Sequence, residues 1–234
     1  MSRLGVERQG RMVWETLRPA VRRDRIDMEF LRCALAAGLN RNSNCIDAGA
    51  HRGDLLEDMV RIAPRGAHIA FEPLPAFAAQ IRSRFAGVRV EEIALWNCEG
   101  TASFTHVRAE PALSGLRVTT PPHNEVEQLS VRTARLDDLI PRDMPVALIK
   151  IDVEGAEHQL LQGAHETLAR WRPILHFEHH QAAKAFGTTS RDVYELLTGP
   201  LEYRIFDLRG RGPYTFAEFQ DAEARQVTNF LARV

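Results

Sequence analysis

The sequence predicts an α/β protein built on a doubly wound, mostly parallel sheet. After residue 43, short apolar segments alternate with amphipathic helical segments, which is the pattern of βαβ units. The segment 146–151 leaves almost no polar face, as expected of a strand inside a sheet that helices cover on both sides. At 234 residues, the chain is long enough to bury the core of one such domain.

The expected elements follow the chain in order. Residues 1–43 form a helical N-terminal segment, because apolar residues recur at helical spacing from Ile26 to Leu35 and Gly38 suits a helix end. Residues 44–234 form the main domain, with a hairpin or lid insertion at about 100–135. Its expected strands are 44–49, 67–73, 88–95, 101–107, 126–136, 145–155, 173–180, 202–208 and 226–234, and its expected helices are 54–63, 75–85, 156–171 and 191–199.

Composition excludes several classes of protein. The formal net charge of −1 provides no general attraction to nucleic acid, which needs a basic face. The three cysteines form no C-x-x-C pair, which argues against a zinc knuckle and a disulfide framework. A run of about eighteen apolar residues, which a membrane span requires, is absent. We therefore expect a cytoplasmic protein without nucleic-acid or membrane partners, and a homodimer is compatible with the sequence.

Acidic residues follow the expected strands at the points where the strands end. They are Asp47, Glu72, Asp152, Glu154 and Glu178. In a doubly wound sheet the ligand binds at the carboxyl ends of the strands, near the point where the strand order reverses. Five carboxylates at one edge repel one another unless a positive ligand, a metal or hydrogen bonds offset their charge. Some of them also have a simpler explanation, because Asp and Glu cap helices well.

Asp47 and Glu72 together indicate an adenosine cofactor. Glu72 follows the glycine turn by about twenty residues, where an acid can accept hydrogen bonds from both ribose hydroxyls. NAD and S-adenosylmethionine both carry that ribose. The turn reads Asp47-x-Gly49-x-x-x-Gly53, so an acid replaces the first glycine of the dinucleotide fingerprint. Because an acid repels pyrophosphate and attracts a cationic methionine moiety, the turn favours S-adenosylmethionine.

Six segments carry a resemblance to a known family: CIDAGAHRG, FEPLP, ALWNCEGTASF, LDDL, IKIDVEGAEHQLLQGA and PILHFEHH. Together they resemble the FkbM family of S-adenosylmethionine-dependent methyltransferases over roughly residues 44–180, and IKIDVEGAE is the most specific part. The resemblance implies a class I methyltransferase (Rossmann-like) fold with an antiparallel closing strand. It also implies O-methylation of a small molecule or sugar.

The resemblance further implies roles for individual residues. It assigns the glycine loop to the methionine side of the cofactor, Glu72 to the ribose, and Asp152 to the neighbourhood of the transferred methyl group. The predicted cofactor-binding set is Asp47, Gly49, Ala50, His51, Gly53, Glu72, Pro73, Ala94, Leu95 and Asp152. His51 departs from the family, which commonly has Asn there. We expect the side chain of Arg52 to point to solvent, because a cation beside the sulfonium is unfavourable.

The predicted catalytic residues are Asp152, Glu178 and His179. Asp152 is the first candidate for the base that takes the acceptor's proton or orients its hydroxyl, and the other two form a second set. The predicted site holds no metal, although the same three side chains leave a divalent cation open as an alternative. The segment 108–128 is a candidate substrate lid, in which Arg108 or Arg117 meets an anionic group, or else a solvated loop.

Three other functions stay open. An NAD-dependent oxidoreductase would also use an acid to bind the ribose. Its fingerprint begins with a glycine, however, and this chain has Asp47 at that position. An RNA or DNA methyltransferase would share the fold, yet amino-directed enzymes of that class usually place an Asn/Asp-Pro-Pro-aromatic motif where this chain has IDVEG. A non-catalytic module could keep the fold and only bind a partner.

Overall fold

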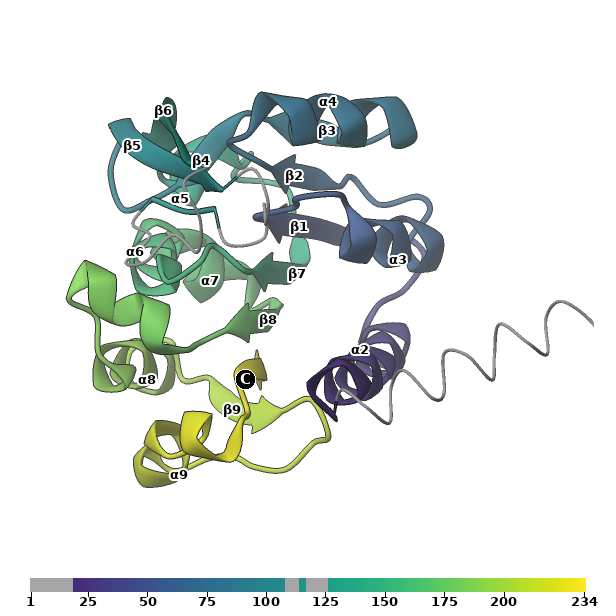
Figure 1. Cartoon of the computed structure of the whole chain (residues 1–234). Helices are drawn as coiled ribbons and strands as arrows, with labels where there is room; N and C mark the ends of the chain where they lie inside the picture. Colours follow the sequence, from purple (N-terminus) through teal and green to yellow (C-terminus); the bar gives the residue numbers. More distant parts are fainter. Residues whose placement is uncertain (1–18, 108–113, 117–125) are drawn as a thin grey trace, which may run out of the picture.

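A seven-stranded sheet organises the computed structural model, which describes residues 19–107, 114–116 and 126–234 (Figure 1). The strand order is β3-β2-β1-β7-β8-β10-β9. The strands are β1 (Asn44–Ala48), β2 (Ile69–Phe71), β3 (Arg89–Glu91), β7 (Val146–Ile151), β8 (Ile174–Glu178), β9 (Arg204–Asp207) and β10 (Asn229–Arg233). Neighbouring strands from β3 to β8 pair in parallel, and β10 runs antiparallel to both β8 and β9. The predicted doubly wound sheet with an antiparallel closing strand is confirmed.

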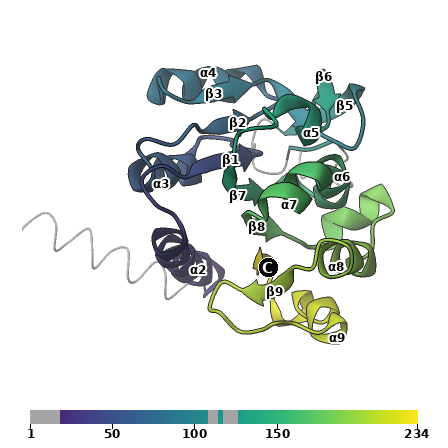
Figure 2. The same cartoon turned by 180° about the vertical axis from the view of Figure 1, so that it is seen from behind.

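Helices cover both faces of this sheet, because alternate residues of its central strands are apolar on opposite sides. Cys45, Ala70 and Leu148 pack on one face against α2 (Pro19–Gly38) and α3 (Asp54–Ile62), and Ile81 of α4 (Pro75–Arg84) joins this cluster. The opposite face carries α5 (Leu136–Leu139), α6 (Glu157–Gly163), α7 (His165–Trp171), α8 (Ser190–Thr198) and α9 (Phe216–Gln220). Figure 2 shows this second set of helices from behind.

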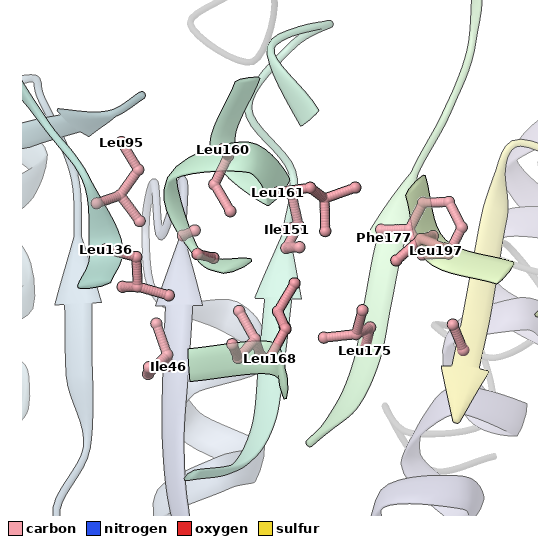
Figure 3. Packing of buried hydrophobic residues seen from close by; sticks show 14 of the residues in the cluster. Ile46, Leu95, Leu136, Ile151, Leu160, Leu161, Leu168, Leu175, Phe177 and Leu197 are labelled. Carbon is pink, nitrogen blue, oxygen red and sulfur yellow. The ribbon is translucent and has the colours of Figure 1, made fainter. Parts of the chain in front are cut away.

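The larger apolar cluster lies on the α6–α7 face. Leu160, Leu161 and Leu168 pack over strand residues that include Ile46 and Ile151 (Figure 3). All five side chains are fully buried. Burial of a Leu or Ile side chain contributes about 1.5–3 kcal/mol each, so this cluster fixes β1 and β7 side by side. This packing therefore also fixes the positions of the carboxyl ends of the two strands.

Two expected elements are each divided in the structure. The expected strand 88–95 is two strands, because the chain leaves the main sheet after β3 and β4 (Ile93–Leu95) joins a second sheet of order β4-β6-β5. The other strands of this sheet are β5 (Gly100–Val107) and β6 (Val126–Ala134), an antiparallel pair as expected, and β4 pairs in parallel with β6. The expected helix 156–171 breaks between α6 and α7, where Gly163 lies so close to Trp96 that a Cβ would stand 2.1 Å from the Trp96 carbonyl oxygen.

Several further features complete the fold. Two short 3₁₀ helices, η2 (Gln181–Phe186) and η3 (Glu223–Arg225), precede α8 and β10 respectively, and the sequence had not indicated them. At the N-terminal side, α2 packs through the fully buried Leu31 and Leu35. Among the described helices, none is long and apolar enough to span a bilayer. The division of the chain at residue 43 stays a prediction. Arg108 and Arg117 of the expected lid lie outside the described residues.

Candidate active site

The glycine turn follows β1 and packs against the end of β7. Gly49 and Gly53 have positive φ angles of 73° and 79°, which an L-residue adopts only with strain. A Cβ on Gly49 would lie 1.8 Å from the carbonyl oxygen of Asp152, so only glycine fits at this contact. The backbone N–H groups of Gly49 and Ala50 both donate to the Phe71 carbonyl, at 3.0 and 3.1 Å. The turn is thereby fixed to β2 as well as to β7.

Glu72 lies directly after β2 and holds the same turn from the other side. Its carboxylate accepts hydrogen bonds from the backbone N–H of His51 at 2.7 Å and of Leu74 at 2.9 Å. The side chain is 4% exposed, and burial raises the pKa of its carboxyl above the usual value. Each carboxylate oxygen has two lone pairs, so both oxygens keep acceptor capacity for a ligand.

A cleft opens between the glycine turn, the end of β2 and the small sheet, and it encloses about 750 Å³ of space that is partly open to solvent. Its lining combines apolar side chains with a few acids and comprises Gly49, His51, Phe71, Glu72, Pro73, Leu74, Ile93, Ala94, Leu95, Phe104, Ser114, Leu116, Asp152, Val153, Glu154 and Ala156. The cleft thus brings together seven of the ten predicted cofactor-binding residues.

Asp47, Ala50 and Gly53 do not line the cleft. Asp47 is 1% exposed, and its Oδ1 lies 3.3 Å from the Nζ of Lys150. The structure therefore supplies a counter-charge for Asp47 from the protein itself, and the interpretation in which this acid meets the cationic end of a cofactor stays a prediction. The sequence did contain a signal, because Lys150 is one of only two lysines and stands in an otherwise apolar strand.

Lys150 also reaches the predicted base. Its Nζ lies 3.4 Å from Oδ2 of Asp152. Burial by itself lowers the pKa of the Lys150 ammonium, but the charges of Asp152 and Asp47 raise it above its usual value, so the lysine is charged. The pKa of Asp152 moves the other way. Burial raises it, but the charges of Lys150 and His176 and the hydrogen bonds with Lys150 and Glu178 together outweigh burial and leave the pKa below the ordinary range.

Three carboxylates gather beyond the ends of β7 and β8, and two of them, Asp152 and Glu154, line the cleft. One ligand oxygen each of Asp152, Glu154 and Glu178 lies within 4.8 Å of the others. Burial and the charges of Asp152 and Glu178 raise the pKa of Glu154 to about 8. Glu154 has a positive φ of 54° in the turn between β7 and α6, whereas the sequence predicted that the strand extends to residue 155. Carboxylates in this arrangement suit a hydroxyl-rich ligand or a divalent cation.

Glu157 supports that turn from inside. Its Oε1 accepts hydrogen bonds from the backbone N–H groups of Gly155 at 2.9 Å and of Val153 at 3.3 Å. The side chain is 1% exposed, and burial raises the pKa of its carboxyl to about 7. Glu157 therefore shapes the loop that carries Asp152 and Glu154, as a first-turn acid of α6.

The two histidines after β8 lie in different surroundings. His179 is 7% exposed, its Nε2 is 2.9 Å from the Ser190 hydroxyl, and its ring stacks on Phe219 with centroids 5.2 Å apart. It does not line the cleft. The Nε2 of His180 instead lies 3.7 Å from the carboxylate of Glu178. The alternation of side chains beyond the strand end could have indicated this, because residues 178 and 180 share one side.

The family model described as "Methyltransferase FkbM domain" matches residues 47–208. A relative called "Methyltransferase 1" from Beauveria bassiana (strain ARSEF 2860) is 25% identical over 169 residues, which are 59% of this chain and 68% of the relative.

Two solved structures share the fold. An FkbM methyltransferase from Methylobacillus flagellatus KT has a TM-score of 0.53 at 14% identity and covers 84% of this chain. The present chain spans only 44% of that protein's length. The plantazolicin methyltransferase BpumL, solved with a desmethyl plantazolicin analog and S-adenosylhomocysteine, has a TM-score of 0.50 at 9% identity and covers 96% of this chain and 88% of its own.

Proposed function

The chain belongs to the FkbM methyltransferase family, and we propose that it transfers a methyl group from S-adenosylmethionine to a hydroxyl oxygen of a small molecule or sugar. The observation that carries this proposal is the placement of Glu72. Its carboxylate lies at the end of β2, lines the cleft and is joined to the glycine turn through His51. An acid in this place suits the two ribose hydroxyls of an adenosine cofactor.

The rest of the cleft fits the same cofactor. Ile93 and Leu95 offer apolar surface to an adenine ring, and His51 lines the glycine-turn side of the cleft. The buried Nε2 of His51 has no hydrogen-bond partner among the described residues, so a ligand group can satisfy it. When bound, S-adenosylmethionine supplies an electrophilic methyl group on a positively charged sulfur.

Asp152 is the residue that we assign to the acceptor's proton. It lines the cleft directly after β7, and its backbone N–H donates to the Ala48 carbonyl at 3.2 Å, which fixes it beside the glycine turn. Its low pKa keeps it ionised, so it can accept a hydrogen bond from an alcohol or take the hydroxyl proton. Glu178 is the second acceptor group, with the His180 imidazole beside it. His179, which does not line the cleft, packs against Phe219 and Ser190 directly after β8.

The choice of acceptor follows from the same side chains. An ionised carboxylate accepts hydrogen bonds and donates none, so Asp152 suits a ligand rich in hydroxyl groups. Its charge repels a carboxylate or phosphate placed at the reacting position. A neutral polyol, phenol or sugar is the acceptor class that this charge favours.

Two measurements test the proposal. First, S-adenosylhomocysteine should raise the melting temperature of the protein and NAD should not, because ligands that bind only the folded state stabilise it. A rise with NAD alone would overturn the cofactor assignment. Second, radiolabel from methyl-labelled S-adenosylmethionine should enter a neutral sugar or small-molecule fraction in a form that survives alkali, as an ether does. Label released by alkali as methanol would indicate a carboxyl acceptor instead.

A further inference from the structure

We infer that Lys150 is a positioning residue that connects the glycine turn of the cofactor site to Asp152, an inference that rests on the proposed function. Its Nζ contacts four groups. Two are carboxylates, Oδ1 of Asp47 at 3.3 Å and Oδ2 of Asp152 at 3.4 Å. The other two are backbone carbonyls of the turn, those of Ala48 at 3.3 Å and of Gly49.

The sheet register creates this arrangement. Lys150 on β7 is aligned with Asp47 on β1, and both residues lie one position before the points where their strands end. Asp152, two residues after Lys150, returns to the same side of the chain. The lysine is 7% exposed, so solvent cannot replace its contacts. Burying a charged amine is costly unless it is paired, and here the pairing groups are parts of the proposed site.

An ammonium group suits this position better than other side chains do. It carries three donors and a compact positive charge, so it can serve carbonyl and carboxylate oxygens at once. The carbonyls of Ala48 and Gly49 belong to the segment that fixes His51 and therefore Glu72. Lys150 thus holds the two ends of the cleft, the ribose-binding acid and the proposed base, in one connected set of contacts.

This role differs from a purely structural one in a measurable way. If Lys150 only stabilised the fold, replacing it would lower the melting temperature, and the variant that still folds would bind cofactor as the wild type does. A lysine that positions the turn also sets the affinity for S-adenosylhomocysteine. The chain offers a matched control, because its only other lysine, Lys184, is exposed on η2 and lies outside the cleft.

The first experiment is titration calorimetry with S-adenosylhomocysteine on the full chain. We expect Lys150→Met to weaken binding about tenfold or more, because contacts to a charged group are lost from the turn. Lys150→Arg should restore part of the affinity, since it keeps the charge, and Lys184→Met should bind as the wild type does. Folded Lys150→Met that binds with wild-type affinity would overturn the inference.

The second experiment needs no change at Lys150. Protein labelled with ¹⁵N at the lysine side chains gives two ammonium signals, which Lys184→Arg assigns. On addition of S-adenosylhomocysteine the Lys150 signal should shift and the Lys184 signal should not. A Lys150 signal that stays in place while calorimetry records binding would overturn the inference even if Lys150→Met fails to fold. A wild-type protein that binds no S-adenosylhomocysteine would overturn the proposed function, and this inference with it.

Discussion

The backbone N–H of His51 donates a 2.7 Å hydrogen bond to the carboxylate of Glu72. This bond joins the glycine turn to the end of β2 across the floor of the cleft. Because Glu72 also accepts from Leu74, its carboxylate is fixed before any ligand arrives. A side chain that is held in place in this way loses little conformational entropy on binding, which favours affinity.

Glu72→Gln should weaken binding of S-adenosylhomocysteine by about ten- to a hundredfold, because one oxygen becomes a donor and the charge is lost. Glutamine is a sharper test than alanine, since alanine also leaves the N–H groups of His51 and Leu74 without their partner. Titration calorimetry measures the effect. Glu91→Gln is the matched control, because Glu91 ends the neighbouring strand β3 and does not line the cleft. Equal affinity in Glu72→Gln and the wild type would exclude the ribose assignment.

Asp47→Asn should reduce both stability and cofactor affinity, whereas Arg52→Ala should change neither. Asp47 is buried against Lys150, so the substitution removes one partner of a buried ion pair and should lower the free energy of unfolding by about 1–3 kcal/mol. Arg52 is exposed, as the sequence predicted. Urea unfolding and calorimetry on both variants test this. Similar losses in the two variants would mean that the loop orientation is wrong.

Much of the fold could be predicted because apolar periodicity records which faces of a segment are buried. Segment 146–151 is apolar on both faces except at Lys150, so its place in the middle of the sheet followed directly. The end of β3 was missed because apolar periodicity records burial and does not show which sheet a segment joins. Glu92 lies between two segments of similar strand character, and nothing local shows that Ile93 pairs with β6 in another sheet.

The candidate site was predicted in part. Strand ends place Glu72, Asp152 and Glu178 at one edge of the sheet, and the sequence shows where strands end. It does not show which charges are paired inside the protein, so the pairing of Asp47 with Lys150 was not predicted. Glu154 was counted among the acids at the strand ends, but the alternative cation site named His179 in its place, because the sequence does not indicate that Glu154 adopts a positive φ of 54°.

The protein should lose stability on acidification from about pH 6.5 to pH 4, in part through His179. Burial lowers the pKa of this imidazole from 6.5 to about 4. In that window the unfolded chain binds a proton that the folded chain does not. The contribution of His179 to the free energy of unfolding is therefore present above pH 6.5 and lost as the pH falls. Its size is at most about 3 kcal/mol. In urea unfolding at several pH values, the free energy of unfolding should change less steeply with pH for His179→Gln than for the wild type.

The exposed His165 provides the control for that measurement. His165→Gln should keep the wild-type slope. If the two variants have the same slope, then His179 already titrates in the folded protein, and its burial against Phe219 and Ser190 does not exclude the proton.

Asp152→Asn should leave the affinity for S-adenosylhomocysteine within a few-fold of the wild type and remove most of the turnover. Asparagine keeps the size of the side chain, and Lys150 still has Asp47 and the turn carbonyls as partners. The charge that takes or orients the acceptor's proton is lost, which should lower kcat by about 10²–10⁴-fold. Methyl transfer in single-turnover and steady-state assays separates this loss from binding, and Glu154→Gln tests whether the neighbouring acid contributes.

The pH profile distinguishes the two roles that Asp152 can have. Because Lys150 holds the pKa of Asp152 below its ordinary range, a base role predicts a rate that rises through one ionisation at acidic pH and is flat near neutrality. Chelators should then have no effect. Inactivation by EDTA with recovery on addition of Mg²⁺ or Mn²⁺ would instead make Asp152, Glu154 and Glu178 the ligands of a cation, since their oxygens lie within 4.8 Å of one another. Full activity in Asp152→Asn would remove Asp152 from the chemistry and leave Glu178, with His180 beside it, as the group that accepts the proton.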